Sequence, residues 1–124
     1  MSKLIGKVCS GKGDFARWIE KLNDHYRRKT GLVLYPGTLN VRLDVPYHIP
    51  PNPLRLEASE YGGTVSVNLV PCKVFGRRAF ILRTDGEEAG LGSHPFEVVE
   101  VATDIKLREA YQLEDGSPVE IELE

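Results

Sequence analysis

A turn followed directly by a β-strand is predicted by the stretch Tyr35-Pro36-Gly37-Thr38-Leu39-Asn40-Val41-Arg42-Leu43. Proline suits the first central position of a turn, and Gly37 can adopt the positive φ that the next position of a type II turn requires. Side chains then alternate between the two faces of the strand. The apolar face is expected to join a core and consists of Leu39, Val41 and Leu43.

The polar face of this strand carries a hydroxyl and a carboxamide two residues apart, on Thr38 and Asn40. Such neutral oxygen donors suit a hard cation such as Mg²⁺, held together with the phosphates of a ligand. The same pair is compatible with a hydrogen-bonded strand end that binds nothing. The residue types alone leave both interpretations open.

The length and composition indicate one domain, residues 1–124, in which acidic and basic residues are mixed along the chain. A formal net charge of −2 argues against a nucleic-acid partner, because a general nucleic-acid binder presents a basic face. No apolar run has membrane-spanning length and no signal peptide is apparent, so we expect a cytoplasmic protein without a membrane partner. Cys9 and Cys72 lack metal-ligand spacing and are predicted to be buried thiols.

Many short strands and two helices are predicted along the rest of the chain. Strands are expected over 3–10, 64–71, 97–102 and 119–123, with a hairpin over 74–82 that turns at 76–78. An apolar stripe with helical spacing predicts a longer helix, with Asp14 as its N-cap and Gly31 at its end. Asp104 is expected to cap a short helix over 105–111, and 84–95 is expected to be a loop. This pattern favours a small closed or partly closed β-barrel over the alternative, a split α+β sheet.

Two further segments carry groups that suit an anionic ligand. Gly11-Lys12-Gly13 leads from a strand into a helix, where backbone N–H groups and a lysine suit phosphate, although Asp14 would compete with an anion. Glu97 begins a predicted strand, and Lys106 and Arg108 place cations on the segment that follows it. A plain strand-to-helix turn and a solvated helical turn explain these residues without a ligand.

Taken together, these motifs resemble those of the CTP-dependent riboflavin kinases, a family described chiefly from archaea. The resemblance spans nearly the whole chain, and the order and spacing of the blocks agree. The family's start, G-x-V-x-S-G-x-G, is matched by Gly6-Lys7-Val8-Cys9-Ser10-Gly11-Lys12-Gly13. Its P-G-T-L-N core is matched by Tyr35-Pro36-Gly37-Thr38-Leu39-Asn40. Its C-terminal pattern is matched by three blocks, Glu97-Val98-Val99-Glu100-Val101-Ala102, Lys106-Leu107-Arg108-Glu109 and Leu113-Glu114-Asp115-Gly116.

The resemblance implies a mainly β fold, a six-stranded cradle-loop (RIFT-type) β-barrel with one longer N-terminal helix and one short C-terminal helix. It implies Mg²⁺-dependent transfer of the γ-phosphoryl group of CTP to the 5′-hydroxyl of riboflavin, which gives FMN and CDP. Thr38 and Asn40 would be the Mg²⁺ ligands, and Glu97 would contact the flavin and orient or deprotonate its hydroxyl. The implied nucleotide-binding residues are Lys12, Gly13, Asp14, Phe15, Ala16, Arg17, Ile105, Lys106, Leu107 and Arg108.

The chain departs from the family pattern in its first loop. The family continues S-G-x-G-E-G, whereas Asp14 is followed here at once by Phe15 and Ala16. The family also has a threonine before the C-terminal block, at a position that falls near Gly92-Ser93. The shorter loop motivates an alternative function, a flavin- or nucleotide-binding module without kinase activity. A DNA-binding regulator with a barrel fold is a weaker alternative that the net charge argues against.

Overall fold

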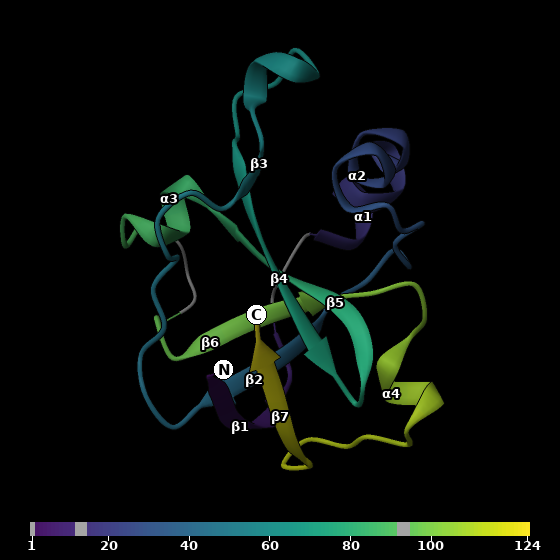
Figure 1. Cartoon of the computed structure of the whole chain (residues 1–124), viewed down its shortest axis with the longest axis vertical. Helices are drawn as coiled ribbons and strands as arrows, with labels where there is room; N and C mark the ends of the chain where they lie inside the picture. Colours follow the sequence, from purple (N-terminus) through teal and green to yellow (C-terminus); the bar gives the residue numbers. More distant parts are fainter. Residues whose placement is uncertain (1, 12–14, 92–94) are drawn as a thin grey trace.

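Six antiparallel strands close into a barrel in the computed structural model, which describes residues 2–11, 15–91 and 95–124 (Figure 1). The strand order is β3-β4-β5-β6-β2-β1-β7, and an additional β4–β7 pairing closes the barrel and leaves β3 as an extra strand. The predicted six-stranded barrel is therefore confirmed, and the split sheet is wrong. The strands are β1 (Lys3–Cys9), β2 (Leu39–Leu43), β3 (Leu54–Leu56), β4 (Val67–Val74), β5 (Arg77–Thr84), β6 (Val98–Ala102) and β7 (Pro118–Leu123).

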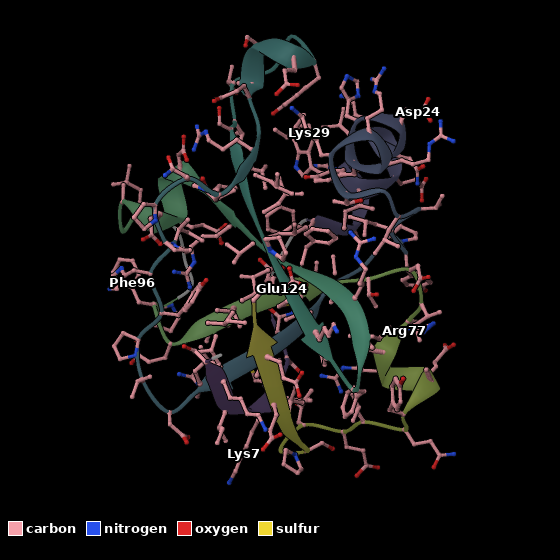
Figure 2. The ribbon with its side chains drawn as sticks, in the orientation of Figure 1. Lys7, Asp24, Lys29, Arg77, Phe96 and Glu124 are labelled. Carbon is pink, nitrogen blue, oxygen red and sulfur yellow. The ribbon has the colours of Figure 1, made fainter. Side chains whose placement is uncertain are left out.

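Short helices surround the barrel (Figure 1). Strand β3 and the chain that follows it up to β4, residues 54–66, form an arm that projects from the barrel (Figure 1). In the described part of the chain the helices are α1 (Phe15–Lys21), α2 (Asn23–Thr30), α3 (Asp85–Glu88), α4 (Leu107–Ala110) and the 3₁₀ helix η1 (Ala58–Glu60). Figure 2 shows Lys29 between α2 and this arm, where its Nζ lies 2.8 Å from a carboxylate oxygen of Glu60. This ion pair joins the helices to the arm.

The predicted helical stripe is buried, but it runs over two helices instead of one. Leu22 adopts φ −107° and ψ 27°, which separates α1 from α2. The next residue, Asn23, is a poor residue for a helix interior because its side chain competes for backbone hydrogen bonds. The helix ends as predicted, at Gly31 with φ 75°, while Asp14 lies outside the described residues. The buried stripe residues pack with β3, β4 and β5 side chains and are Phe15, Ile19, Leu22 and Tyr26.

Strand β2 buries its apolar face as predicted, but the turn before it differs from the prediction. Leu39, Val41 and Leu43 belong to the cluster that fills the barrel. The Gly37 N–H donates to the Tyr35 carbonyl at 2.8 Å, and Gly37 does not have a positive φ. The turn is thus a γ-turn centred on a proline, whose fixed φ suits that geometry, and the type II turn is wrong.

Strand β4 starts and ends three residues later than predicted, because Pro71 does not terminate it. β3 pairs with residues 67–69 and β7 pairs with residues 72–74. Pro71 therefore lies where the neighbouring strand changes, and its missing N–H breaks no ladder there. The following hairpin turns at Phe75-Gly76, slightly earlier than predicted. Both residues have positive φ, 55° and 73°, as a two-residue type I′ turn requires.

Two further predictions are wrong, the loop over 84–95 and the N-cap at Asp104. The segment 84–95 contains α3, whose first turn is capped reciprocally by Thr84 and Glu87, each binding the other's backbone N–H. Helix α4 begins after Lys106, which makes no side-chain cap. Asp104 instead forms an ion pair with Arg77, whose Nε lies 3.5 Å from Asp104 Oδ1, so the predicted Asp104 cap is absent.

Both cysteines are free thiols, but only Cys72 is buried as predicted. Burial raises the pKa of the Cys72 thiol to about 12. Cys9 is partly exposed at the end of β1. No helix in the described ranges is long and apolar enough to cross a membrane.

A charged network fastens the arm to the barrel through Asp85. Arg55 in β3 donates to both Asp85 oxygens, at 2.9 and 2.8 Å, and also pairs with Glu57. Asn68 in β4 donates to Asp85 Oδ1 at 2.9 Å. The hydrogen bonds from Arg55, with a smaller contribution from Asn68, hold the pKa of Asp85 below its usual value.

Asp85→Asn is expected to lower the free energy of unfolding by about 1 kcal/mol at neutral pH. Because the folded-state pKa of Asp85 is depressed, its contribution is present above the unfolded-state pKa of about 3.9 and is lost as the pH falls through the folded-state pKa. Urea denaturation at pH 7, 4 and 3 measures the difference. Asp44→Asn, at an exposed residue, is the control. A difference that does not depend on pH would contradict this prediction.

Candidate functional site

The Thr38 hydroxyl, at the entrance to β2, donates a hydrogen bond to Glu100 Oε1 at 2.7 Å. Glu100 lies in β6, where the strand register pairs it with Asn40. Directly paired residues point to the same face of a sheet. Glu100 is only 4% exposed. A hydroxyl, a carboxamide and a buried carboxylate are therefore grouped on one face of two adjacent strands.

The side-chain oxygen of Asn40 is buried and has no hydrogen-bond partner among the described residues. Leaving a buried acceptor unpaired costs about 1–3 kcal/mol, so an oxygen of this kind suggests a ligand from outside the chain. The chain after β1 passes directly over this carboxamide. Cys9 pairs with Asn40 in the β1–β2 register, and a Cβ added to Gly11 would lie 2.1 Å from Asn40 Oδ1. Only glycine fits this approach without moving Asn40.

A small pocket of about 70 Å³ opens beside Thr38. It lies between the turn before β2 and the segment that leads into α4. Lys106 and Arg108 line this pocket together with Thr38 and contribute two cationic side chains to it. The lining residues are Tyr35, Gly37, Thr38, Leu39, Val101, Ile105, Lys106, Leu107 and Arg108. Positive charge and neutral oxygen donors thus meet at one end of the barrel.

The predicted metal-binding pair and the predicted nucleotide-binding segment 105–108 are brought together by this pocket. Two of the predicted nucleotide-binding residues, Phe15 and Leu107, are buried in the two core clusters, and Leu107 also lines the pocket beside Thr38. Ala16 and Arg17 are exposed at the start of α1, and Ile105 is partly buried. The predicted residues Lys12, Gly13 and Asp14 lie outside the described ranges.

Glu97, the carboxylate singled out from the motif, lies away from this group. It precedes β6, and its carbonyl accepts from the Leu43 N–H at 2.7 Å, at the opposite end of the β2–β6 pair from Thr38. Three residues of extended chain, about 10 Å, separate Glu97 from Glu100. Figure 2 shows Phe96, the neighbour of Glu97, on the opposite side of the barrel from Arg77, which forms an ion pair with Asp104 just before the segment 105–108.

Glu100 was missed because the block Glu97-Val98-Val99-Glu100-Val101-Ala102 contains two glutamates, and the sequence does not show which one faces Thr38. The pairing of β2 with β6 decides this, and it is a long-range contact. One local signal was available. The β6 residues that belong to the cluster filling the barrel are Val99 and Val101, so Glu100 must point to the other face of the strand.

The donor set at this site suits a hard cation only if a ligand adds oxygens. In the described part of the chain, no group of three or more His, Cys, Asp or Glu side chains could hold a metal ion. The Asn40 oxygen, which has no partner in the described part of the chain, and the Thr38 hydroxyl are neutral oxygen ligands of the kind that Mg²⁺ takes alongside phosphate oxygens. The residues present therefore fit a Mg²⁺–phosphate ligand.

A family model described as CTP-dep_RFKase, domain of unknown function DUF120, matches residues 8–123 of this chain. A riboflavin kinase from Pyrobaculum aerophilum is 34% identical over 132 residues, covering 98% of this chain and 60% of the relative. Riboflavin kinases from Methanocella arvoryzae and Pyrococcus abyssi are 35% and 31% identical, covering 96% and 97% of this chain and 56% and 58% of the relatives. The chain thus spans less than two-thirds of the length of these relatives.

Proposed function

Because the chain belongs to the CTP-dependent riboflavin kinase family, we propose that it transfers the γ-phosphoryl group of CTP to the 5′-hydroxyl of riboflavin, giving FMN and CDP. One observation supports this function in particular, the buried Asn40 oxygen that has no hydrogen-bond partner among the described residues. It adjoins the Thr38 hydroxyl and the Glu100 carboxylate, beside a pocket lined by Lys106 and Arg108. These groups are the kinds that phosphoryl transfer requires.

Thr38 and Asn40 are the proposed ligands of Mg²⁺. Asn40 contributes a buried oxygen that already lacks a partner among the described residues. Thr38 gives its hydroxyl hydrogen to Glu100, which leaves the lone pairs of its oxygen available to a cation. When bound, Mg²⁺ would neutralise charge on the phosphate oxygens.

Residues 12–17 and 105–108 are the proposed nucleotide-binding segments. Lys106 and Arg108 are the cations at the pocket beside Thr38, where they would bind phosphate oxygens. Phosphoryl transfer through a loose transition state depends mainly on positioning and on charge neutralisation. The chain's task is therefore to hold the phosphates and the acceptor hydroxyl in line.

Glu100 is the proposed carboxylate for orienting the riboflavin hydroxyl and accepting its proton. It is buried and hydrogen-bonded to Thr38, so its position beside the proposed metal-binding pair is defined. Glu97, which the family motif suggests for this role and for flavin contact, is the second candidate. Its position at the far end of the strand pair makes it the weaker candidate for the reacting hydroxyl.

The donor and the activity are tested together by incubating the protein with riboflavin, Mg²⁺ and either CTP, UTP, GTP or ATP. Chromatography measures FMN in each mixture. We expect FMN to form fastest with CTP. The absence of FMN with every donor would overturn the proposed function. Binding of riboflavin or FMN without turnover would then favour the alternative, a flavin-binding module.

Gly11→Ala is expected to lower the rate of FMN formation at least about 10-fold, with a small effect on stability. The added Cβ would overlap the Asn40 carboxamide, so that side chain must move. The effect on stability is expected to be small because Gly11 itself is exposed. Gly86→Ala is the control, since a Cβ there meets only Thr84 Oγ1, at 3.9 Å. Steady-state rates and urea denaturation of both variants check this. A fully active Gly11→Ala variant would show that the Asn40 position is not critical.

A further inference from the structure

Asp115 connects Arg108, in the proposed nucleotide-binding segment 105–108, to Ser10, which precedes the other segment, 12–17. The block Leu113-Glu114-Asp115-Gly116 has no role in the reaction proposed above. Asp115 Oδ2 accepts a hydrogen bond from Ser10 Oγ at 2.8 Å. Asp115 Oδ1 accepts one from Arg108 Nη2 at 2.6 Å. A single carboxylate therefore connects the chain just after β1 to the first turn of α4.

The turn that carries Asp115 is itself fastened to β1 through the backbone. The Gly116 N–H donates to the Val8 carbonyl at 2.8 Å, and the Val8 N–H donates to the Ser117 carbonyl at 2.8 Å. Gly116 has φ 93°, which permits this turn without strain. The Asp115 carboxylate thus acts from a fixed position on the barrel.

Among the described residues, the side-chain hydrogen bonds of Arg108 come from a single nitrogen, Nη2. Its Nη2 also donates to the Cys9 carbonyl at 3.3 Å, so both contacts use the same nitrogen. The other N–H groups of the guanidinium are not used by these contacts and remain for a phosphate. Arg108 is about one-third exposed and lines the pocket beside Thr38. An arginine fixed in this way loses less conformational freedom when it binds an anion.

We propose that Asp115 is a positioning residue for nucleotide binding, which orients the Arg108 guanidinium and sets its distance from Ser10 at the start of the first loop. This inference rests on the proposed function, because Arg108 matters here as a phosphate-binding cation. Hydrogen bonds from Arg108, and secondarily from Ser10, hold the pKa of Asp115 below its usual value, so the carboxylate is charged at neutral pH. An Asp115 that merely competed with phosphate for Arg108 would have the opposite effect on nucleotide affinity.

Asp115→Ala is expected to raise the KM for CTP about 10-fold while kcat and the KM for riboflavin stay within about 2-fold of wild type. Ser10→Ala removes only one of the two contacts and is expected to raise the KM for CTP about 3-fold. Asp115→Asn keeps an acceptor for Arg108 and is expected to fall between wild type and Asp115→Ala. Glu114→Ala, which removes the neighbouring exposed carboxylate, is the matched control. Loss of folded protein alone would lower kcat and leave both KM values unchanged.

An unchanged or lower KM for CTP in an active Asp115→Ala variant would overturn this inference and leave the proposed function intact. If the wild-type protein forms no FMN, titration calorimetry with CDP tests Asp115 independently of turnover. About 10-fold weaker CDP binding by Asp115→Ala supports the positioning role. Equal CDP affinity, or no CDP binding by the wild-type protein, overturns it.

Discussion

Asn40→Ala is expected to lower the rate of FMN formation at least about 100-fold without lowering the free energy of unfolding. The Asn40 side-chain oxygen is buried and has no partner among the described residues, so truncation breaks no hydrogen bond to that oxygen. Because a buried unpaired acceptor is itself destabilising, the variant is expected to be as stable as wild type or more stable. The remaining activity is expected to require a higher Mg²⁺ concentration, since one proposed ligand is gone.

Asn68→Ala is the matched control for this prediction. Asn68 is also a buried asparagine, but its side chain donates to the Arg83 carbonyl and to Asp85 and accepts from Arg55. Its truncation is expected to cost about 1–3 kcal/mol of stability and to leave the Mg²⁺ dependence unchanged. FMN formation over a Mg²⁺ titration and urea denaturation compare the two variants. An Asn40→Ala variant that is destabilised but fully active would assign Asn40 a structural role only.

Glu100→Gln is expected to lower kcat for FMN formation by about 10²- to 10⁴-fold. Glutamine has nearly the same size and keeps an oxygen that can accept the Thr38 hydrogen bond. The loss therefore measures what the negative charge does, in orienting the acceptor hydroxyl and taking its proton. The KM for CTP is expected to change little, because Lys106 and Arg108 are the proposed phosphate-binding side chains. Initial rates at saturating CTP and riboflavin give kcat.

Glu97→Gln is the matched variant, because Glu97 is the carboxylate that the family motif suggests. It is expected to lower kcat less than about 10-fold, since Glu97 lies at the opposite end of the β2–β6 pair from Thr38. The reverse ranking of the two variants would transfer the catalytic role to Glu97. Full activity in both variants would remove carboxylate chemistry from the proposed mechanism.

Local patterns predicted most of the barrel. The alternation Leu39, Val41, Leu43 identified both the strand β2 and its buried face, because side-chain direction in a strand has a period of two. Gly31 marked a helix end because a left-handed residue is needed there. The pattern T-x-x-E at Thr84 and Glu87 is typical of a capping box, which the structure contains at the start of α3. The glycines nearby favoured the incorrect prediction of a loop.

Long-range pairing explains what local patterns missed. Pro71 reads as a strand end, and only the change of neighbour from β3 to β7 shows why the strand continues through it. Thr38 and Asn40 were identified from their spacing, whereas Glu100 joins them only through the register of β2 with β6. Asp115 likewise contacts Ser10 across 105 positions of sequence. No local pattern specifies such contacts.

The decisive measurement is the stoichiometry of products formed by the wild-type protein from riboflavin and CTP. With Mg²⁺ present, we predict equal molar amounts of FMN and CDP, and we predict neither product when EDTA replaces Mg²⁺. Chromatography separates and quantifies both products in one run. CDP without FMN, or neither product from folded protein in the presence of Mg²⁺, would contradict a kinase site built from Thr38, Asn40 and Glu100.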